Sequence, residues 1–93
     1  MIKTFRCRDT ERVFNFKLVR KWEPGLRKAA LRKMKWLDAA DDLNDLRVPP
    51  ANRLEKLKGD RQGQHSIRVN DQYRLCFVWR NGHAHDVELV DYH

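Results

Sequence analysis

The last three residues of the sequence carry side chains that can transfer protons. Asp91, Tyr92 and His93 follow directly after the apolar run Val-Glu-Leu-Val. An imidazole titrates near pH ~6.5, so His93 suits general acid or base work, whereas a phenol with an ordinary pKa of about 10 is a poor base. Two interpretations are open: the terminus is part of a working surface, or it is an ordinary frayed chain end.

A second group of functional side chains is concentrated in the stretch before this end. Arginine grips phosphate through a bidentate fork, lysine acts as a point charge, and tyrosine can stack on a base. Two of the arginines flank a short predicted turn, so their side chains can reach one surface of a sheet. The pattern predicts an RNA-binding surface, with the solvated face of a β-meander as the alternative. The cations are Arg53, Lys56, Lys58, Arg61, Arg68 and Arg74, interleaved with His65, Asn70 and Tyr73.

The sequence gives less support to metal binding, phosphate-loop binding and nucleophilic catalysis. His83, His85 and Asp86 are possible metal ligands, but alternate strand residues give two ligands on one face at best, so we expect no metal site. The four glycines form no phosphate-binding loop, and no serine lies in a nucleophile-elbow context. Cys7 and Cys76 are too few and too far apart for a disulfide framework, and both are expected to be buried.

Length and charge narrow the class of protein. Ninety-three residues, 41% of them hydrophobic, predict one domain over residues 1–93 with a modest core. The net charge is +7, and residues 1–40 hold twelve Lys and Arg against four Asp and Glu. A polyanion is the expected partner class, although small basic domains also exist without nucleic-acid partners. Because no signal peptide or transmembrane run is visible, we expect a cytoplasmic protein with no membrane attachment.

The first half of the sequence is predicted to be mainly helical. Residues 1–6 alternate like a short strand, and Asp9 or Thr10 can cap a short helix after it. Apolar residues recur at three- and four-residue steps over 22–43, with Pro24 in the first turn, which predicts the main helix.

The charged face of the main helix has two interpretations. It is either simply solvated or a contact face for RNA or the ribosome. Residues 41–47 are predicted to form a further short helix, and two prolines then stop helical structure. The basic residues on the helix face are Arg27, Lys28, Arg32 and Lys35.

The second half changes to the two-residue period of strands. Asn81-Gly82 is the strongest predicted hairpin turn, because both residues accept a positive φ. Asn70-Asp71 and Gly59-Asp60 are further predicted turns. Helices followed by consecutive strands indicate an α+β fold with two or three N-terminal helices and an antiparallel meander. The predicted strands cover 53–57, 65–69, 73–79 and 83–93.

Longer blocks of the sequence resemble a known family. The stretches LKGDRQGQHSIRVNDQYRLCF and VELVDYH are similar to the HigB toxins of the RelE superfamily, in particular the HigB/GraT-like subgroup. The MIKTF start and the centre from LDAA to NRLE also fit, so the resemblance covers nearly the whole chain. It implies the RelE-like fold, which is a small, chiefly antiparallel sheet packed against N-terminal helices.

The resemblance also implies a function. Such toxins belong to type II toxin–antitoxin systems and are ribosome-dependent endoribonucleases that cut translated mRNA in the A site of the small (30S) subunit. They need neither metal nor cofactor. A HigA-like helix-turn-helix antitoxin neutralises them, and operator DNA is reached only indirectly, through this antitoxin.

Residue by residue, the functional positions of the family fall on five residues here. Lys58 and Arg74 would stabilise the phosphate, and the chain end would transfer protons. One position departs from the family, because Glu55 stands where relatives have a histidine three residues before the lysine. Glu55 is then a base or a polar orienting group, or the activity is tuned differently. The remaining three positions are Asp91, Tyr92 and His93, with Asp91, Glu55 or a shifted Tyr92 as the base if His93 is the acid.

Two alternatives to this function remain open. A non-catalytic module would inhibit translation by occupying RNA or the ribosome, and it would depend on the helix cations rather than on the chain end. A hydrolase of free RNA would cleave without ribosomes.

Overall fold

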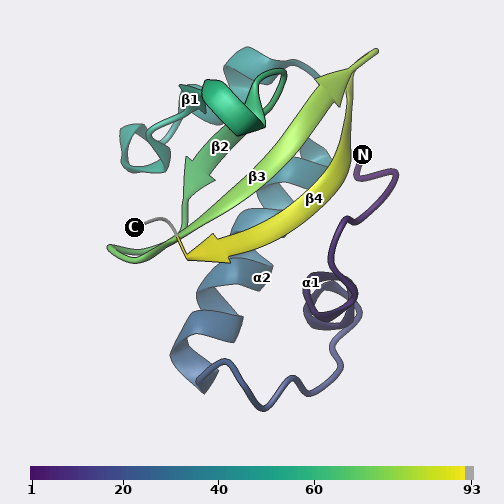
Figure 1. Cartoon of the computed structure of the whole chain (residues 1–93), viewed down its shortest axis with the longest axis vertical. Helices are drawn as coiled ribbons and strands as arrows, with labels where there is room; N and C mark the ends of the chain where they lie inside the picture. The colour runs from purple at the N-terminus through teal and green to yellow at the C-terminus, as the bar shows by residue number, and fades with distance from the viewer. Residues whose placement is uncertain (92–93) are drawn as a thin grey trace.

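The chain folds into an antiparallel sheet with helices packed on one face. The computed structural model describes residues 1–91. Helix α2 (Pro24–Ala39) crosses behind the sheet and the shorter α1 (Arg8–Phe14) lies to one side of it (Figure 1). This arrangement confirms the predicted α+β fold, with two α-helices preceding the sheet. The strands lie in the order β1 (Glu55–Lys56), β2 (His65–Arg68), β3 (Tyr73–Arg80) and β4 (His83–Asp91).

The main helix begins where the sequence predicts. Pro24 occupies the first turn of α2, where a missing N–H costs no hydrogen bond. The helix ends at Ala39, before the predicted end, because Ala40 is extended with a ψ of 132°. The short helix predicted next is a 3-10 helix, η1 (Leu43–Arg47), and Asp42 caps it by accepting a hydrogen bond from the Asn44 N–H.

The predicted cap of the first helix is wrong. Asp9 and Thr10 lie inside α1, which starts at Arg8 after Cys7, and the side chain of Cys7 makes no capping hydrogen bond. The two residues have other roles. Asp9 pairs with Lys21 at 3.0 Å, while Thr10 turns inward toward the sheet.

The hairpins follow the predicted turn chemistry. Asn81 and Gly82 both have positive φ, 54° and 78°, which joins β3 to β4 through a tight two-residue turn. Strand β1 is shorter than the predicted 53–57, because Arg53 adopts the left-handed conformation with a φ of 45°. Two further 3-10 helices, η2 (Pro50–Asn52) and η3 (Gly59–Arg61), flank β1 along the chain.

The predicted first strand over residues 1–6 is not a regular strand. This segment instead runs parallel to β4 and contacts it through two isolated bridges, at Ala84 and Val87. The pairing of β4 with β3 shifts register opposite Phe77, where Asp86 takes a positive φ of 53°. The segment covers part of the exposed edge of β4, which would otherwise present unpaired backbone groups.

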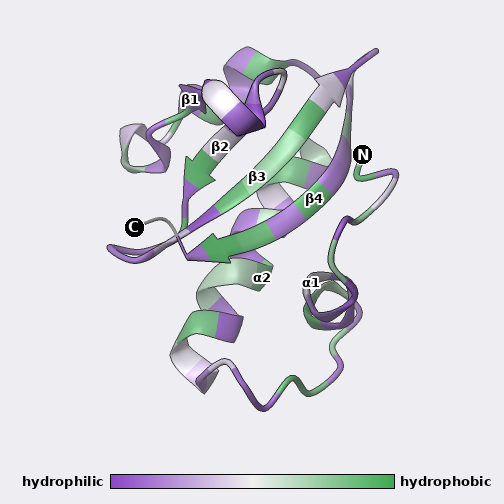
Figure 2. Cartoon of the chain, in the orientation of Figure 1, coloured by the Kyte–Doolittle hydropathy of each residue, from purple (hydrophilic) through white to green (hydrophobic). Residues whose placement is uncertain are grey.

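The hydrophobic core lies between the helices and the adjacent sheet face, here called the inner face. Helix α2 contacts β3 and β4, and α1 contacts α2 and β4. Leu75 and Phe77 of β3 are fully buried, as are Met34 and Leu37 of α2. Figure 2 shows hydrophobic stretches of β3 and β4 interrupted by hydrophilic residues, as expected for strands with two different faces.

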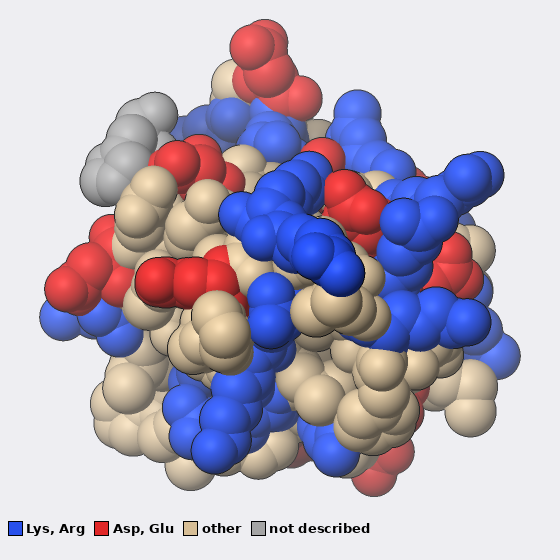
Figure 3. All heavy atoms as spheres, turned by 90° about the horizontal axis from the view of Figure 1, so that it is seen from below, with Lys and Arg blue, Asp and Glu red and all other residues tan. Residues whose placement is uncertain are grey.

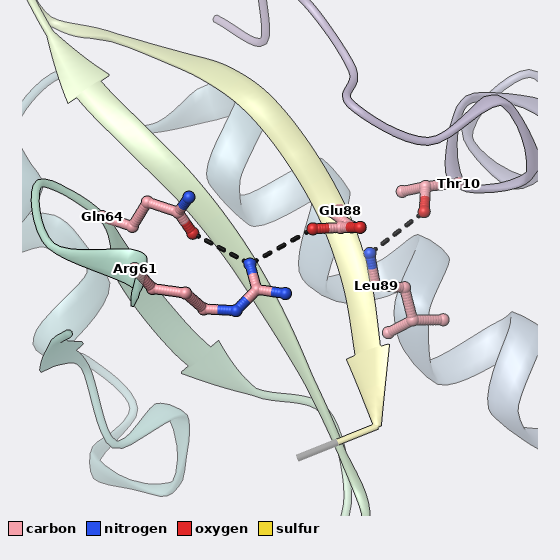
Figure 4. Close-up of polar contacts among 5 residues, drawn as sticks. All are labelled: Thr10, Arg61, Gln64, Glu88 and Leu89. Carbon is pink, nitrogen blue, oxygen red and sulfur yellow. Dashed lines mark hydrogen bonds and ion pairs between the residues drawn. The ribbon is translucent and has the colours of Figure 1, made fainter. Parts of the chain in front are cut away.

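Thr10 ties the first helix to the last strand. Its side chain is fully buried, and its Oγ1 accepts a hydrogen bond from the Leu89 N–H at 3.0 Å (Figure 4). This contact satisfies a backbone donor on the edge of β4.

We expect Thr10→Val to lower the free energy of unfolding by about 1–3 kcal/mol, because valine keeps the volume but leaves the buried Leu89 N–H without this acceptor. Thr10→Ser is the matched control: it keeps the hydroxyl, loses one methyl group and should cost about 1 kcal/mol or less. Urea denaturation measures both. Wild-type stability in Thr10→Val would contradict the role given to this hydrogen bond.

Candidate active site on the outer face of the sheet

The sheet face turned away from the helices, here called the outer face, carries Glu55, Arg68 and Arg74 of the predicted functional residues, and Arg61 reaches over it. Strand register places them in two rows, because partners directly opposite each other share a face. Arg68 lies opposite Arg74, which lies opposite Val90. The second row is Glu55, Ser66, Cys76 and Glu88. The prediction that the two arginines flanking the β2–β3 turn reach one surface agrees with this register.

Arg74 is at the centre of this face and is almost excluded from water. Only 9% of the residue is exposed. Its Nε donates to Ser66 Oγ at 2.7 Å, and its Nη2 donates to the Arg53 carbonyl at 2.6 Å and to the Ser66 carbonyl at 3.3 Å. Glu55 Oε2 lies 4.0 Å from the same Nη2. The guanidinium is therefore held in one orientation by groups from three segments.

Arg61 covers the other row of the outer face. Its Nη1 donates to Gln64 Oε1 at 3.1 Å and to Glu88 Oε1 at 3.2 Å (Figure 4). A polar hollow of about 300 Å³ opens beside it, lined also by Arg6 and Asp60. Arg61 thus links the η3 segment to β4 across the sheet.

The β2–β3 turn uses two of the predicted RNA-binding residues for its own structure. Asn70 Oδ1 accepts from the backbone N–H groups of Gln72 and Tyr73, at 2.8 and 2.7 Å. Arg68 forms an ion pair with Asp71 across the same turn. Tyr73 points to the inner face, where it lines a hollow of about 340 Å³ next to α2.

The exposed cations lie on the β1 side of the sheet. Lys56 in β1 and Lys58, which precedes η3, are both exposed, as is the side chain of Arg53. Lys56 lies opposite His65, whose pKa is lowered first by burial and then by the nearby charges of Lys56 and Arg47. The structure therefore groups Arg53, Glu55 and Arg74 directly, with Lys58 three residues beyond Glu55.

The last described residue brings the chain end beside the start of β3. Asp91 lies opposite Tyr73 and accepts a hydrogen bond from Gln72 Nε2 at 2.9 Å. Tyr73 is the neighbour of Arg74, so the end of β4 runs alongside the arginine-bearing strand. The predicted catalytic residues Tyr92 and His93 lie outside the described residues.

Several residues that build this site were not singled out in the sequence. Ser66, Gln64 and Glu88 supply acceptors to the two arginines, and the Arg53 carbonyl does so through the backbone. The place of Ser66 could have been predicted, because strand alternation puts it on the same face as Arg74. Within residues 1–91, no three metal-ligating side chains come together, and no helix is long and apolar enough to span a membrane.

Solved structures of other proteins share this fold. One is the YoeB–YefM complex from Staphylococcus aureus, with a TM-score of 0.63, 18% identity, and coverage of 100% of this chain and 98% of the matched one. A heterotetrameric YoeB–YefM toxin–antitoxin complex from the same organism matches with a TM-score of 0.62 at 20% identity, again covering 100% and 98%. At these identities the likeness concerns the fold.

The sequence comparison then gives the family. The chain belongs to the HigB-like toxins, RelE-like toxins of type II toxin–antitoxin systems, and the match covers residues 3–93. Toxin HigB-1 of Vibrio cholerae is 55% identical over 56 residues, which are 60% of this chain and 59% of that protein. Endoribonuclease HigB of Proteus vulgaris is 34% identical over 61 residues, 66% and 65% of the two chains. The chain thus spans less than two thirds of the length of these curated relatives.

Alkylation of the two cysteines tests whether the outer face is closed to solvent. Cys76 is fully buried between β2 and β4, and burial raises the pKa of its thiol, so at about pH 8 it stays protonated and covered. We expect iodoacetamide to alkylate the partly exposed Cys7 first, as followed by peptide mass spectrometry. In denaturing urea both should react. Equal labelling of the native protein would show that the outer face opens.

Proposed function

We propose that this chain is an endoribonuclease toxin that cleaves translated mRNA in the ribosomal A site. One observation carries the proposal: a nearly buried arginine is oriented by Ser66 and the Arg53 carbonyl on a face that also presents Glu55. A fixed guanidinium suits a phosphate that gains charge during reaction, since it needs no reorganisation at that moment. The name of the Proteus vulgaris relative supports the same reaction class.

The proposed step is a transesterification within the RNA. A base removes the proton of a ribose 2′-OH, the oxygen attacks the adjacent phosphorus, and the bond to the 5′-oxygen breaks. The products are a 2′,3′-cyclic phosphate and a 5′-hydroxyl, whose proton comes from an acid. Lys58 and Arg74 stabilise the charged phosphate and His93 is the acid, while Asp91, Glu55 and Tyr92 are the candidates for the base. No metal or cofactor takes part.

The place of Glu55 supports a role in this chemistry. Its carboxylate is half exposed and lies 4.0 Å from Arg74 Nη2, so one guanidinium can contact both the carboxylate and a phosphate. Glu55 then acts as the base or orients the 2′-OH. The position that holds a histidine in relatives thus keeps a polar, proton-accepting group here.

The RNA strand would follow the cations around Arg74. Arg53, Lys56 and Lys58 are exposed, whereas Arg61 and Arg68 are paired with Glu88 and Asp71. Phosphate would have to replace these carboxylates, which costs little because the pairs are solvent-accessible. Asn70 would contribute by shaping the turn that holds Arg68, whereas Tyr73 points to the inner face and so lies away from a strand on the outer face.

The helix side of the molecule offers a surface for the proposed HigA-like antitoxin. Phe16 and Leu18 are 74% and 60% exposed, and they border an apolar groove of about 360 Å³ between α1 and α2. Lys17 and Lys28 line the same groove. Apolar floor and cationic rim together fit an apolar antitoxin segment flanked by acidic residues. The antitoxin would carry any contact with operator DNA, and the toxin would act in the cytoplasm.

Mapping of mRNA 5′ ends in cells expressing the toxin tests the catalytic proposal. Wild type should produce new 5′ ends within translated frames, and Arg74→Ala and His93→Ala should each lower cleavage by about 10²–10⁴-fold, because they remove charge stabilisation and proton transfer. Lys35→Ala on the exposed face of α2 is the control and should cleave normally.

Other outcomes would replace this proposal. Growth inhibition that survives His93→Ala and Arg74→Ala but is lost when the α2 cations are neutralised would indicate an inhibitor that acts by occupancy. Equal cleavage of purified RNA without ribosomes would indicate a hydrolase of free RNA.

The antitoxin surface is tested with the helix-turn-helix protein encoded beside the toxin gene. We expect Phe16→Ser combined with Leu18→Ser to weaken its binding at least about tenfold, because the apolar contact is lost. Val48→Ser is the matched control, since Val48 is 73% exposed and does not line this groove. Calorimetric titration measures the affinity of the wild type, the double variant and the control for this protein. Unchanged affinity in the double variant would place the antitoxin elsewhere.

A further inference from the structure

One lysine of α2 is buried although the other cations near it in the sequence are exposed. Lys33 is 6% exposed, while Arg32 and Lys35 are exposed. Its Nζ donates to Asn52 Oδ1 and lies 4.6 Å from the centroid of the Trp36 ring. Burial lowers the pKa of Lys33, and the charges of Arg32 and Arg68 lower it further. Burying such a charged group costs free energy unless it is hydrogen-bonded, so the contact with Asn52 needs a structural explanation.

Asn52 uses all of its side-chain groups inside the protein. It is fully buried, accepts from Lys33, and its Nδ2 donates to the carbonyls of Leu46 and Val48 at 3.2 and 3.4 Å. Its backbone N–H donates to the Pro49 carbonyl at 2.9 Å. Asn52 therefore fixes the segment from η1 to η2 against α2.

The residue after Asn52 is the one that holds the central arginine. Arg53 has the left-handed angles φ 45° and ψ 57°, which a non-glycine residue adopts only when its surroundings impose them. Its N–H donates to the Pro50 carbonyl at 3.0 Å, and its carbonyl accepts from Arg74 Nη2 at 2.6 Å. The direction of that carbonyl thus depends on how the preceding turn is held.

We propose that Lys33 and Asn52 are positioning residues for Arg74, acting through the carbonyl of Arg53. The path runs from α2 on the helix side, through the turn at residues 46–53, to the guanidinium on the outer face. Neither residue touches the RNA. They hold the arginine in one orientation, so that binding of a phosphate would need no search among rotamers.

The inference rests on the proposed function for its effect on activity, but the positioning itself can be measured without RNA. The Arg74 Nε–H donates to Ser66 Oγ in a buried site, so its NMR signal should exchange slowly with water. We expect Asn52→Ala and Lys33→Met to accelerate this exchange at least about tenfold while the protein stays folded. Asn44→Ala and Lys35→Met are matched controls, an exposed asparagine of η1 and an exposed lysine of α2, and should leave the exchange unchanged.

Single-turnover mRNA cleavage on ribosomes supplies the second measurement. Asn52→Ala should lower the rate at least about tenfold in the wild-type background and have no further effect in the Arg74→Ala background. A residue that matters only for stability would lower the rate in both backgrounds. Additive effects would therefore overturn the proposal.

Each remaining outcome is also decisive. Unchanged Nε–H exchange in folded Asn52→Ala or Lys33→Met would refute the positioning path whatever the activity. If wild type itself fails to cleave mRNA, the proposed function fails, and the exchange measurement still decides the positioning. Where Asn52→Ala does not fold, Lys33→Met, which keeps an unbranched apolar chain in place of the lysine, carries the test alone.

Discussion

The outer face depends on the burial of one charged side chain. A guanidinium that is 9% exposed would be strongly destabilising without partners, since desolvating an unpaired charge costs several kcal/mol. Arg74 avoids this cost by donating to Ser66 of β2 and to the Arg53 carbonyl before β1, with Glu55 of β1 at 4.0 Å. These partners come from separate segments, so the register of β1 on β2 and of β2 on β3 must be right at once.

The same requirement couples the site to the hydrophobic core. Strand β3 alternates, so Leu75 and Phe77 face α2 while Arg74 and Cys76 face outward. A shift of one residue in β3 would bury a charge in the core and expose leucine, which makes a slipped register very costly. The apolar contacts of the inner face therefore hold the polar geometry of the outer face in place. The candidate site and the core thus lie on opposite faces of the same strands.

The features that could be predicted depend on residues that are close together in the sequence. The alternation of 73–79, the Asn81-Gly82 turn and the proline at the start of α2 each report on neighbouring residues, and all three agree with the structure. The shared surface of Arg68 and Arg74 also followed from strand alternation around one turn. The residues at the chain end were singled out by their side-chain chemistry, and the resemblance to a family then favoured a catalytic role over an ordinary chain end.

What escaped prediction depended on contacts distant in the sequence. Residues 1–6 pair in parallel with β4 on both sides of the irregularity at Asp86, and no local period encodes this. Lys33 looks like its charged neighbours in the sequence, and only its contact with Asn52, 19 residues away, distinguishes it. A glycine at this position would have indicated a left-handed conformation, but Arg53 gives no such indication.

The distribution of charge has a consequence for how RNA would be bound. Three arginines of the outer face have a carboxylate nearby, Arg61 with Glu88, Arg68 with Asp71 and Arg74 with Glu55. The excess of cations lies instead in the N-terminal half, and Figure 3 shows Lys and Arg spread over the end of the molecule that carries the loop between α1 and α2.

Attraction of a polyanion at long range therefore comes from a surface other than the site, and it weakens beyond about 10 Å at ordinary ionic strength. A phosphate near Arg74 competes with Glu55 and gains little from net charge. Such a site favours RNA that a larger scaffold already holds in place over RNA that must be captured from solution. In the proposed reaction, a ribosome-bound strand would suit this pairing of charges, because the cost of ordering the strand would be met before the toxin binds.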